Sequence, residues 1–227
     1  MKTIGIIPAR LQSTRLPRKL LKVIADKPLL EWTYLNACKS DLDEVVIACD
    51  CEEIWTVAQK FAETYMTSEH PCGTDRVAEV ARNLNADVIV NIQGDEPLMP
   101  VEIINTVTRG TLECGMSTAA SVYVYPEEIS GRDMVKVVLD SNGYAIYFSR
   151  FPISNYKHLG IYAYGRDWLE LFSRFPQSSQ EKRENLEQLR WLQAGKKIKV
   201  FLTDKDSISV NTEEDLKKVE KVLSGKI

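Results

Sequence analysis

Short apolar runs alternate with amphipathic segments along the first half of the chain. Continuous apolar runs predict buried strands, and apolar residues at helical spacing between them predict helices. The expected strands are Thr3–Pro8, Glu44–Cys49, Thr64–Thr67 and Asp87–Ile92, and the expected helices are Pro28–Lys39, Glu53–Glu63, Thr74–Leu84 and Val101–Thr111. Buried strands joined by helices indicate a parallel sheet that is covered on both faces.

The pattern changes in the second half, where extended segments are no longer regularly separated by helices. The expected strands are Met116–Tyr125, Val135–Asp140, Tyr144–Ser149, His158–Tyr164 and Lys197–Thr203, and the expected helices are Glu181–Gln193 and Thr212–Leu223. Ser-Asn-Gly at 141–143 is a hairpin turn, with glycine where positive φ is needed. We therefore predict one α/β domain, doubly wound over 1–114 and mixed over 115–227.

Composition narrows the class of protein. The 227 residues are 44% hydrophobic and 27% charged, as in ordinary soluble domains. No apolar run reaches the length of a membrane span, and the N-terminus lacks the features of a signal peptide. The five cysteines are odd in number and form no C-x-x-C pair, which favours free thiols in a reducing compartment. We expect a cytoplasmic protein without membrane segments.

Charge is unevenly distributed along the chain. The net charge of −3 gives little support to nucleic-acid binding. The first 25 residues, however, contain six basic residues and no acid: Lys2, Arg10, Arg15, Arg18, Lys19 and Lys22. Such a cluster on an acidic chain indicates either a site for a small anionic ligand or a solvated basic loop.

Several common catalytic motifs are absent from the sequence. It contains no G-x-G-x-x-G, no G-x-x-x-x-G-K-[ST], no H-E-x-x-H and no G-x-S-x-G. Their absence argues against dinucleotide oxidoreductases, P-loop kinases, zincins and α/β-hydrolases.

The first motif with chemical content is IIPARLQSTRLPRK, Ile6–Lys19. An expected buried strand leads directly into a loop that carries several basic side chains and hydroxyls. Ligands of open α/β sheets bind at the carboxyl ends of the strands, and Arg and Lys there can neutralise phosphates. We interpret this segment as a triphosphate-binding loop, with a disordered loop as the alternative.

The second motif is VIVNIQGDEPL, Val88–Leu98. An apolar strand is followed at its carboxyl end by polar residues, among them Asp95. A carboxylate that faces a phosphate site needs a divalent cation between the two, and Mg²⁺ is commonly held by carboxylates together with substrate phosphates. The alternative is a turn in which Asp95 caps the next helix.

Seven segments occur in order over nearly the whole chain: IPARLQSTRLPRKLL, HPCGTDR, NIQGDEPL, KVVLDSNGYAIYFSR, KHLGIYAY, ENLEQLR and VNTEEDL. Together they closely resemble the 3-deoxy-manno-octulosonate (Kdo) cytidylyltransferases. The resemblance implies a three-layer, Rossmann-like fold of the nucleotide-diphospho-sugar transferase type. It also implies CTP and a 2-keto acid sugar as substrates, Mg²⁺ as cofactor, a homodimer, and a role in lipopolysaccharide biosynthesis.

The resemblance assigns roles to individual residues. Arg10, Lys19 and Asp95 match the catalytic residues. The nucleotide-binding residues that it implies are Arg10, Arg15, Lys19, Gly73, Thr74, Arg76 and Gln93. The sugar-binding residues are Arg150, His158, Tyr162, Glu187 and Gln188, and the metal ligands are Asp95 and Asn211. Residues 1–114 thereby become a nucleotide-binding half, and 115–227 a sugar-binding and dimerisation half.

The sugar-site residues also make chemical sense without the resemblance, although each has an alternative. Arg150 could pair with the sugar carboxylate. His158 and Tyr162 lie at i, i+4 on an expected strand, so they face the same side, but either could be a packing residue. Glu187 and Glu181 lie on the same face of an expected helix, and that face could be solvated.

The chain departs from the family pattern in three places. Cys72 replaces the usual serine, and Asn211 replaces an aspartate, so a neutral ligand stands where a carboxylate is usual. Only seven residues separate Arg150 from His158, where the family has a longer insert. These departures keep two alternatives open: activation of another acid sugar (sialic, legionaminic or amino-Kdo type), or a non-catalytic nucleotide-binding homologue.

Overall fold

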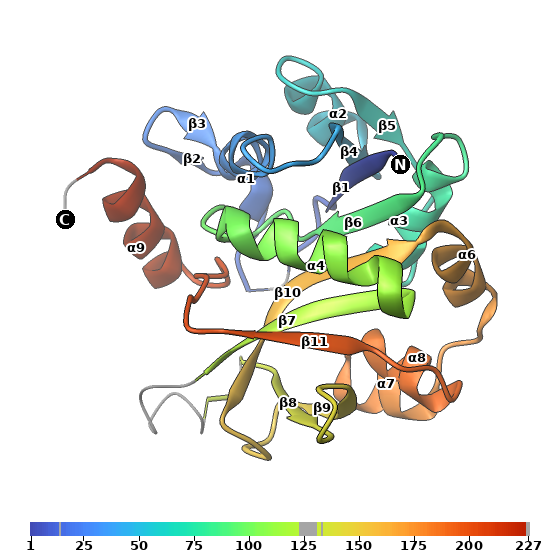
Figure 1. Cartoon of the computed structure of the whole chain (residues 1–227). Helices are drawn as coiled ribbons and strands as arrows, with labels where there is room; N and C mark the ends of the chain where they lie inside the picture. Colours follow the sequence, from blue (N-terminus) through green and yellow to red (C-terminus); the bar gives the residue numbers. More distant parts are fainter. Residues whose placement is uncertain (14, 123–130, 133, 226–227) are drawn as a thin grey trace.

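A twisted sheet runs through the molecule, with helices on both faces (Figure 1). The structure, a computed structural model, describes all residues except 14, 123–130, 133 and 226–227. The strand order is β11-β7-β10-β6-β1-β4-β5, and the hairpin β8-β9 is attached to β10. The bounds of the main strands are β1 (Thr3–Ala9), β4 (Glu44–Cys49), β5 (Thr64–Met66), β6 (Val88–Ile92), β7 (Met116–Val122), β10 (Tyr156–Gly165) and β11 (Lys199–Thr203). The hairpin strands are β8 (Lys136–Leu139) and β9 (Ala145–Ser149), and a small separate ribbon is formed by β2 (Val23–Ile24) and β3 (Lys27–Pro28).

The helices divide between the two faces of the sheet. One buried cluster packs the sheet against α1 (Leu29–Ala37), α2 (Glu52–Ala58), α4 (Val101–Cys114) and α9 (Glu213–Leu223). The other packs it against α3 (Gly73–Ala81), α6 (Arg166–Arg174) and α8 (Gln188–Gln193). Among the described residues, the remaining short helices are η1 (Lys19–Leu21) and α7 (Ser179–Glu184). The predicted three-layer α/β fold is therefore confirmed.

The strand directions agree with the pattern of the two halves. β1 is parallel to both β4 and β6, and β4 is parallel to β5, as continuous apolar runs joined by helices indicate. β10 is antiparallel to both β6 and β7, so the sheet is mixed. Because β10 pairs with β6, one continuous sheet carries residues of both halves.

Three sequence predictions for local structure need correction. The expected helix Glu181–Gln193 is two helices, because Asn185 adopts φ 54° and ends α7; asparagine tolerates this left-handed region. The expected helix Glu53–Glu63 ends at Ala58. Helix α6 was missed, although Leu169 and Phe172 have the i, i+3 spacing of its buried side. Residues 123–125 of an expected strand lie outside the described residues.

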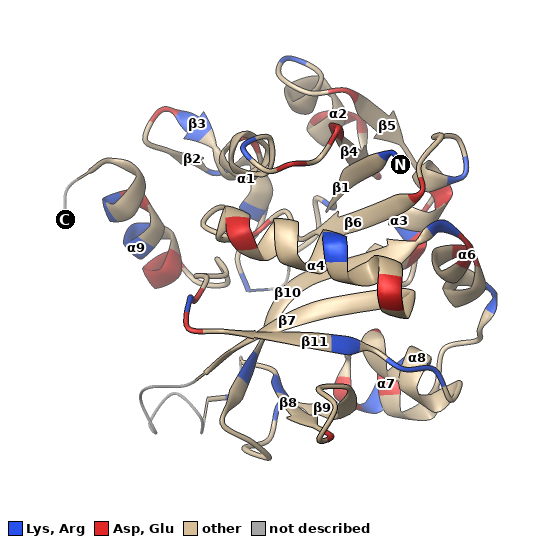
Figure 2. Cartoon of the chain, viewed as in Figure 1, with Lys and Arg blue, Asp and Glu red and all other residues tan. Residues whose placement is uncertain are grey.

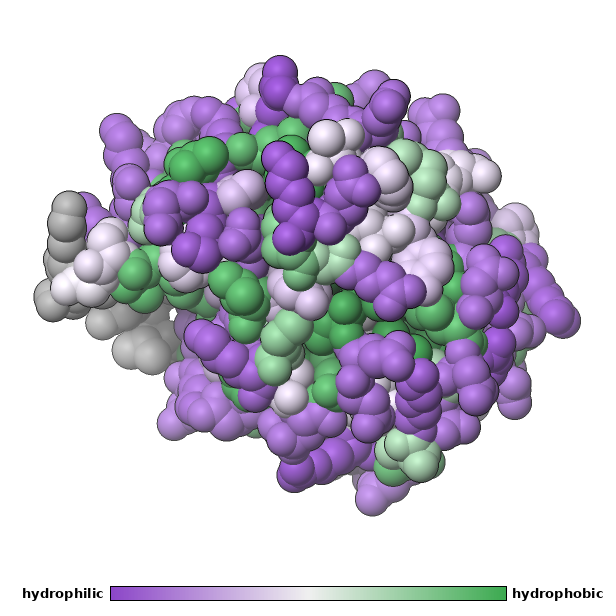
Figure 3. All heavy atoms as spheres, turned by 90° about the horizontal axis from the view of Figure 1, so that it is seen from above, coloured by the Kyte–Doolittle hydropathy of each residue, from purple (hydrophilic) through white to green (hydrophobic). Residues whose placement is uncertain are grey.

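Charged side chains cover the outer layers of the molecule. Figure 2 shows acidic and basic residues together on α4 and on α9. The face seen in Figure 3 is mostly hydrophilic, with smaller hydrophobic areas between the polar side chains. No helix in the described part of the chain is long and apolar enough to cross a membrane.

Candidate active site

A cavity of about 1110 Å³ lies at the end of the sheet where β1 and β6 finish. Its walls come from the loop after β1, the start of α3, the turn after β6, strand β10, the α7–α8 region and residues 206–218. Of the residues with predicted site roles, all except Lys19 and Thr74 line it. The carboxyl ends of parallel strands are where open α/β sheets bind ligands.

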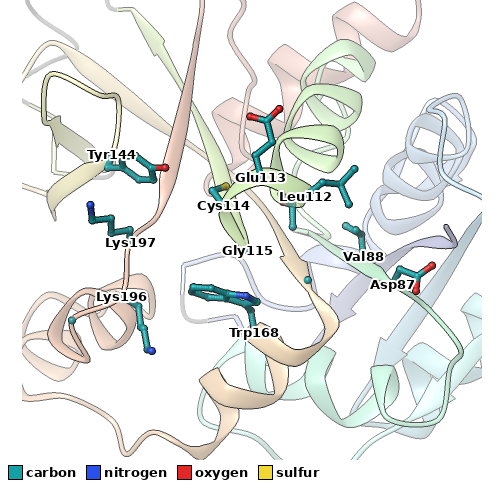
Figure 4. A pocket seen from close by; sticks show the side chains of 13 residues that line it. Asp87, Val88, Leu112, Glu113, Cys114, Gly115, Tyr144, Trp168, Lys196 and Lys197 are labelled. Carbon is teal, nitrogen blue, oxygen red and sulfur yellow. The ribbon is translucent and has the colours of Figure 1, made fainter.

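A second cavity, of about 580 Å³, lies at the opposite end of β6 (Figure 4). Asp87 and Val88 line it at the start of that strand, and Trp168 and Lys196 lie on other sides. None of the residues with predicted site roles belongs to it. The larger cavity is therefore the candidate active site.

The loop after β1 brings basic side chains to this cavity. Arg10 and Arg15 line it, and Lys19 Nζ lies 2.5 Å from Asp95 Oδ2. Arg15 Nη2 donates to Asn211 Oδ1 at 2.8 Å. The basic loop thus contacts both predicted metal ligands through Lys19 and Arg15, while Arg10 and Arg15 are themselves exposed to solvent.

The other basic residues of the first 25 have different partners. Lys2 pairs with Glu44 at 2.7 Å near the start of β1, which is the far end of that strand. Arg18 pairs with Glu53, and Lys22 pairs with Glu213 at 2.5 Å. Of the six basic residues, Arg10, Arg15 and Lys19 are thus the ones at the site.

The two predicted metal ligands are held next to one another by the backbone. Val210 N donates to Asp95 O at 2.9 Å, which places the following residue, Asn211, beside the turn after β6. No group of three or more His, Cys, Asp or Glu in the described residues is arranged to hold a metal. Asp95 and Asn211 offer one carboxylate and one amide oxygen, which fit a Mg²⁺ ion whose other ligands are phosphates and water.

Glu96 also lines the cavity, a position that the motif contained but that received no role from the sequence. It is buried, and Ser207 Oγ donates to its Oε2 at 2.5 Å. Burial, followed by the charge of Asp95, raises the pKa of Glu96 to about 7. The hydrogen bond between Ser207 and Glu96 connects the segment that carries Asn211 to the turn after β6.

The start of α3 forms the next part of the wall. Gly73 and Arg76 line the cavity, whereas Thr74 is fully buried behind it. The Arg76 guanidinium points inward, because Nη2 bonds Asp50 Oδ2 at 2.8 Å and Nε bonds Thr67 Oγ1 at 3.1 Å. Its side chain therefore stabilises the wall in addition to lining it.

His158 is both a core residue and part of the cavity wall. Its ring lies edge-on to Phe148 and 5.2 Å from the ring of Tyr162, which is also buried and lines the cavity. Thr118 donates its hydroxyl hydrogen to Ile161 O (2.6 Å), so its oxygen accepts from His158 Nε2–H (2.9 Å). Burial lowers the pKa of His158 to about 3. The ring is therefore neutral at pH 7, with Nδ1 as an acceptor.

The predicted sugar residues Arg150, Glu187 and Gln188 also line the cavity. The carboxylate of Glu187 accepts from Thr74 N at 3.1 Å and from Thr74 Oγ1 at 2.7 Å, so it is engaged within the protein. The hypothesis of a solvated face through Glu181 and Glu187 is wrong. Glu181 is buried and pairs with Arg190 at 2.6 Å.

Comparison with known proteins agrees with this geometry. The cytidylyltransferase family model matches residues 4–198. Proteins described as 3-deoxy-manno-octulosonate cytidylyltransferase are 41% identical in Chloroherpeton thalassium, over 100% of both chains, and 44% identical in Fusobacterium nucleatum, over 96% of both. The chain belongs to the cytidylyltransferases, and within them to the 3-deoxy-manno-octulosonate cytidylyltransferase family.

Solved structures support the same conclusion. A structure described as CMP:2-keto-3-deoxy-manno-octonic acid synthetase complexed with CTP is 34% identical, with a TM-score of 0.92 over 100% of both chains. A cytidylyltransferase from Leptospira borgpetersenii has a TM-score of 0.70 and 18% identity, over 99% of this chain and 87% of its own. The second likeness concerns the fold alone.

The buried, neutral His158 predicts a specific dependence of stability on pH. Its pKa lies below the unfolded value of about 6.5, so between pH 6.5 and 3 the unfolded chain binds a proton that the native state does not. The neutral His158 ring therefore contributes fully to the free energy of unfolding above the pKa of the unfolded chain, and this contribution is lost as the pH falls below it. Between pH 7 and pH 5 we expect the wild type to lose about 2 kcal/mol more than His158→Gln.

Urea unfolding of both proteins at the two pH values measures this difference. The variant keeps His70 and all carboxylates, so their contributions cancel in the comparison. Equal losses in the two proteins would contradict a neutral native His158.

Proposed function

We propose that the protein transfers the cytidylyl group of CTP to Kdo, giving CMP-Kdo and pyrophosphate. The observation that carries this proposal is the meeting of Arg10, Arg15 and Lys19 with Asp95 and Asn211 in a cavity that Arg150 and His158 also line. The relatives named above support Kdo as the acid sugar. They do not favour the two alternatives, another acid sugar or a non-catalytic homologue.

In this proposal the anomeric hydroxyl of the sugar attacks the α-phosphate of CTP, and pyrophosphate leaves. Arg10, Arg15 and Lys19 bind the phosphates and neutralise their charge, so the protein acts mainly by positioning and electrostatics. Gly73 and Gln93 line the cavity for the nucleoside. Thr74 and Arg76 hold that wall from inside through their buried hydrogen bonds.

We propose that the cofactor is Mg²⁺, held by Asp95 with weaker help from Asn211. Lys19 Nζ pairs with the Asp95 carboxylate, and Arg15 Nη2 donates to the Asn211 amide oxygen. These contacts support the view that positive charge is favoured beside the two oxygens. When bound, a divalent cation would neutralise charge on the phosphates. The protein's part is to supply the oxygens and to keep the basic loop beside them.

The acid-sugar end of the cavity is assigned by its chemistry. Arg150 pairs with the sugar carboxylate, because guanidinium–carboxylate pairs are strong and directional. His158 Nδ1 accepts from a sugar hydroxyl, since the ring is neutral and Nε2–H is engaged by Thr118. Tyr162 and Gln188 complete this wall.

We further propose a homodimer in the cytoplasm, acting in lipopolysaccharide biosynthesis and not on nucleic acid or membranes. Val122, Ile146, Phe151 and Ile153 are exposed around the β8–β9 hairpin and the short loop that follows it, which supports a contact there between copies. The five cysteines are free thiols, which supports a reducing compartment. A mass in solution of a single 25.8 kDa chain would contradict the dimer.

Asp95→Asn should abolish turnover and leave the fold intact. Loss of the only carboxylate among the two metal ligands removes several kcal/mol of transition-state stabilisation, roughly a thousandfold in rate. The measurement is pyrophosphate release from CTP and Kdo with Mg²⁺. Asp41→Asn is the matched control, because Asp41 is exposed and pairs with Arg109 outside the cavity. Wild-type rates in Asp95→Asn at saturating Mg²⁺ would make Asp95 a turn residue.

Asn211→Asp should strengthen the response to Mg²⁺. A carboxylate in place of the amide adds one negative charge beside the cation, and desolvation offsets most of the added Coulomb attraction, so the net gain is about 1–2 kcal/mol. We expect the Mg²⁺ concentration for half-maximal rate to fall roughly tenfold. Superimposable Mg²⁺ titrations of the two proteins would place Asn211 outside the metal site.

A further inference from the structure

The first turn of α3 is not capped by its own N-cap residue. Within the described residues Cys72 makes no capping bond to the helix, and its thiol donates to Asp75 Oδ2 at 3.1 Å. A serine hydroxyl is a strong N-cap, whereas a thiol is a weak hydrogen-bonding group. The backbone N–H groups of this turn therefore need partners from elsewhere in the molecule.

Glu187, at the start of α8, supplies one of these partners. Its Oε2 accepts from Thr74 N at 3.1 Å and its Oε1 accepts from Thr74 Oγ1 at 2.7 Å. The carboxylate thus caps α3 from a position 113 residues further along the chain. A negative charge at a helix N-terminus is favourable.

Arg190, one turn further along α8, also binds the first turn of α3. Its Nη1 donates to both oxygens of Asp75, at 3.0 and 3.1 Å, and its Nε and Nη2 donate to Glu181 at 2.9 and 2.6 Å. The Arg190 side chain is 2% exposed, and its guanidinium carbon lies 4.4 Å from the ring centre of Phe172. Burial alone would lower the pKa of Arg190, but its hydrogen bonds to the two carboxylates outweigh burial and raise it.

A third contact reaches Thr74 from the sheet. Tyr164 Oη lies 3.2 Å from Thr74 Oγ1, and Asn91 Nδ2 donates to the same oxygen at 3.1 Å. Tyr164 is on β10, two residues after Tyr162, and the two rings are 6.3 Å apart. Thr74 is therefore held by β6, β10 and α8 together.

These contacts join the two ends of the cavity. Gly73 and Arg76, in the first turn of α3, line the wall that we assign to the nucleotide, and Gln188 and Tyr162 line the wall that we assign to the acid sugar. Asp75 and Arg190 do not line the cavity among the described residues, so neither is placed to touch a substrate. Their effect on substrates must pass through the two walls that they join.

We propose that Glu187 and Arg190 are positioning residues that couple the CTP and acid-sugar sites through the first turn of α3. Glu187, which the family resemblance assigns to the sugar, here acts through Thr74. Because these bonds join the wall that CTP contacts to the wall that the acid sugar contacts, each substrate raises the affinity for the other. This inference rests on the proposed cytidylyltransferase function.

The test is the variant Asp75→Asn, in which Arg190 keeps its pair with Glu181. Initial rates over a grid of CTP and Kdo concentrations give both KM values and the dissociation constant of CTP without sugar. We expect both KM values to rise about five- to twentyfold, and the ratio of the CTP dissociation constant to its KM to fall toward one. A role in stability alone would lower Tm without moving that ratio.

Arg190→Lys is the second variant, since it keeps the charge but cannot bridge Asp75 and Glu181 with a planar fork; it serves if Asp75→Asn does not fold. Arg166→Lys is the matched control, because Arg166 bonds the carbonyls of Leu84 and Ala86 away from the cavity. It should leave the ratio unchanged.

The outcomes separate the two proposals. A folded wild type that releases no pyrophosphate from CTP and Kdo overturns the proposed function itself. An active wild type, with folded variants whose KM values and ratio are unchanged, overturns the coupling. A rise in the KM for Kdo alone also overturns it, because the contact between Arg190 and Asp75 would then act only on the acid-sugar wall.

Discussion

The proposed site depends on placing a carboxylate and the triphosphate of CTP at the same end of one sheet without mutual repulsion. β1 and β6 are parallel neighbours, so the basic loop after β1 and Asp95 after β6 arrive at the same edge. Lys19 and Asp95 make a 2.5 Å ion pair with side chains that are 13% and 23% exposed. In such a partly buried place electrostatic attraction is stronger than in bulk water. The charge balance at this edge is the basis of the phosphate and cation positions that we propose.

The remaining walls are arranged around that edge. β10 is inserted antiparallel between β6 and β7, which brings His158 and Tyr162 beside the turn after β6. The hydrogen bond from Val210 N to Asp95 O fastens the segment before α9 to the same turn. Each wall thus comes from a different part of the chain, and the continuous sheet fixes their relative positions.

Much of this could be predicted from the sequence, and the limits have physical reasons. The buried strands are recognisable from their apolar runs. Arg10 follows one of them directly, and Asp95 lies in the turn after another, so the common location of these two residues follows from parallel pairing. Local periodicity places Glu181 on a helical face but does not reveal its buried partner. The pair Arg190–Asp75 joins residues 115 positions apart, and such long-range contacts leave no mark in spacing.

The inward orientation of the Arg76 side chain could not be predicted for the same reason, since its partner Asp50 lies just after strand β4. The break in the helix at Asn185 could not be predicted either. An asparagine in the left-handed region interrupts a helix without changing the spacing of the apolar residues around it. The sequence therefore indicated which residues line this cavity better than it explained what each one contacts.

The most direct test of the account is the kinetic effect of Arg10→Ala on the two substrates. Arg10 lines the cavity at the end of β1, in the loop that we assign to the triphosphate. The account predicts that the KM for CTP rises at least tenfold, with little change in the KM for Kdo, because a charge-assisted hydrogen bond to phosphate is lost. A selective rise in the KM for Kdo, with CTP unaffected, would contradict the placement of the phosphates on which the whole site is built.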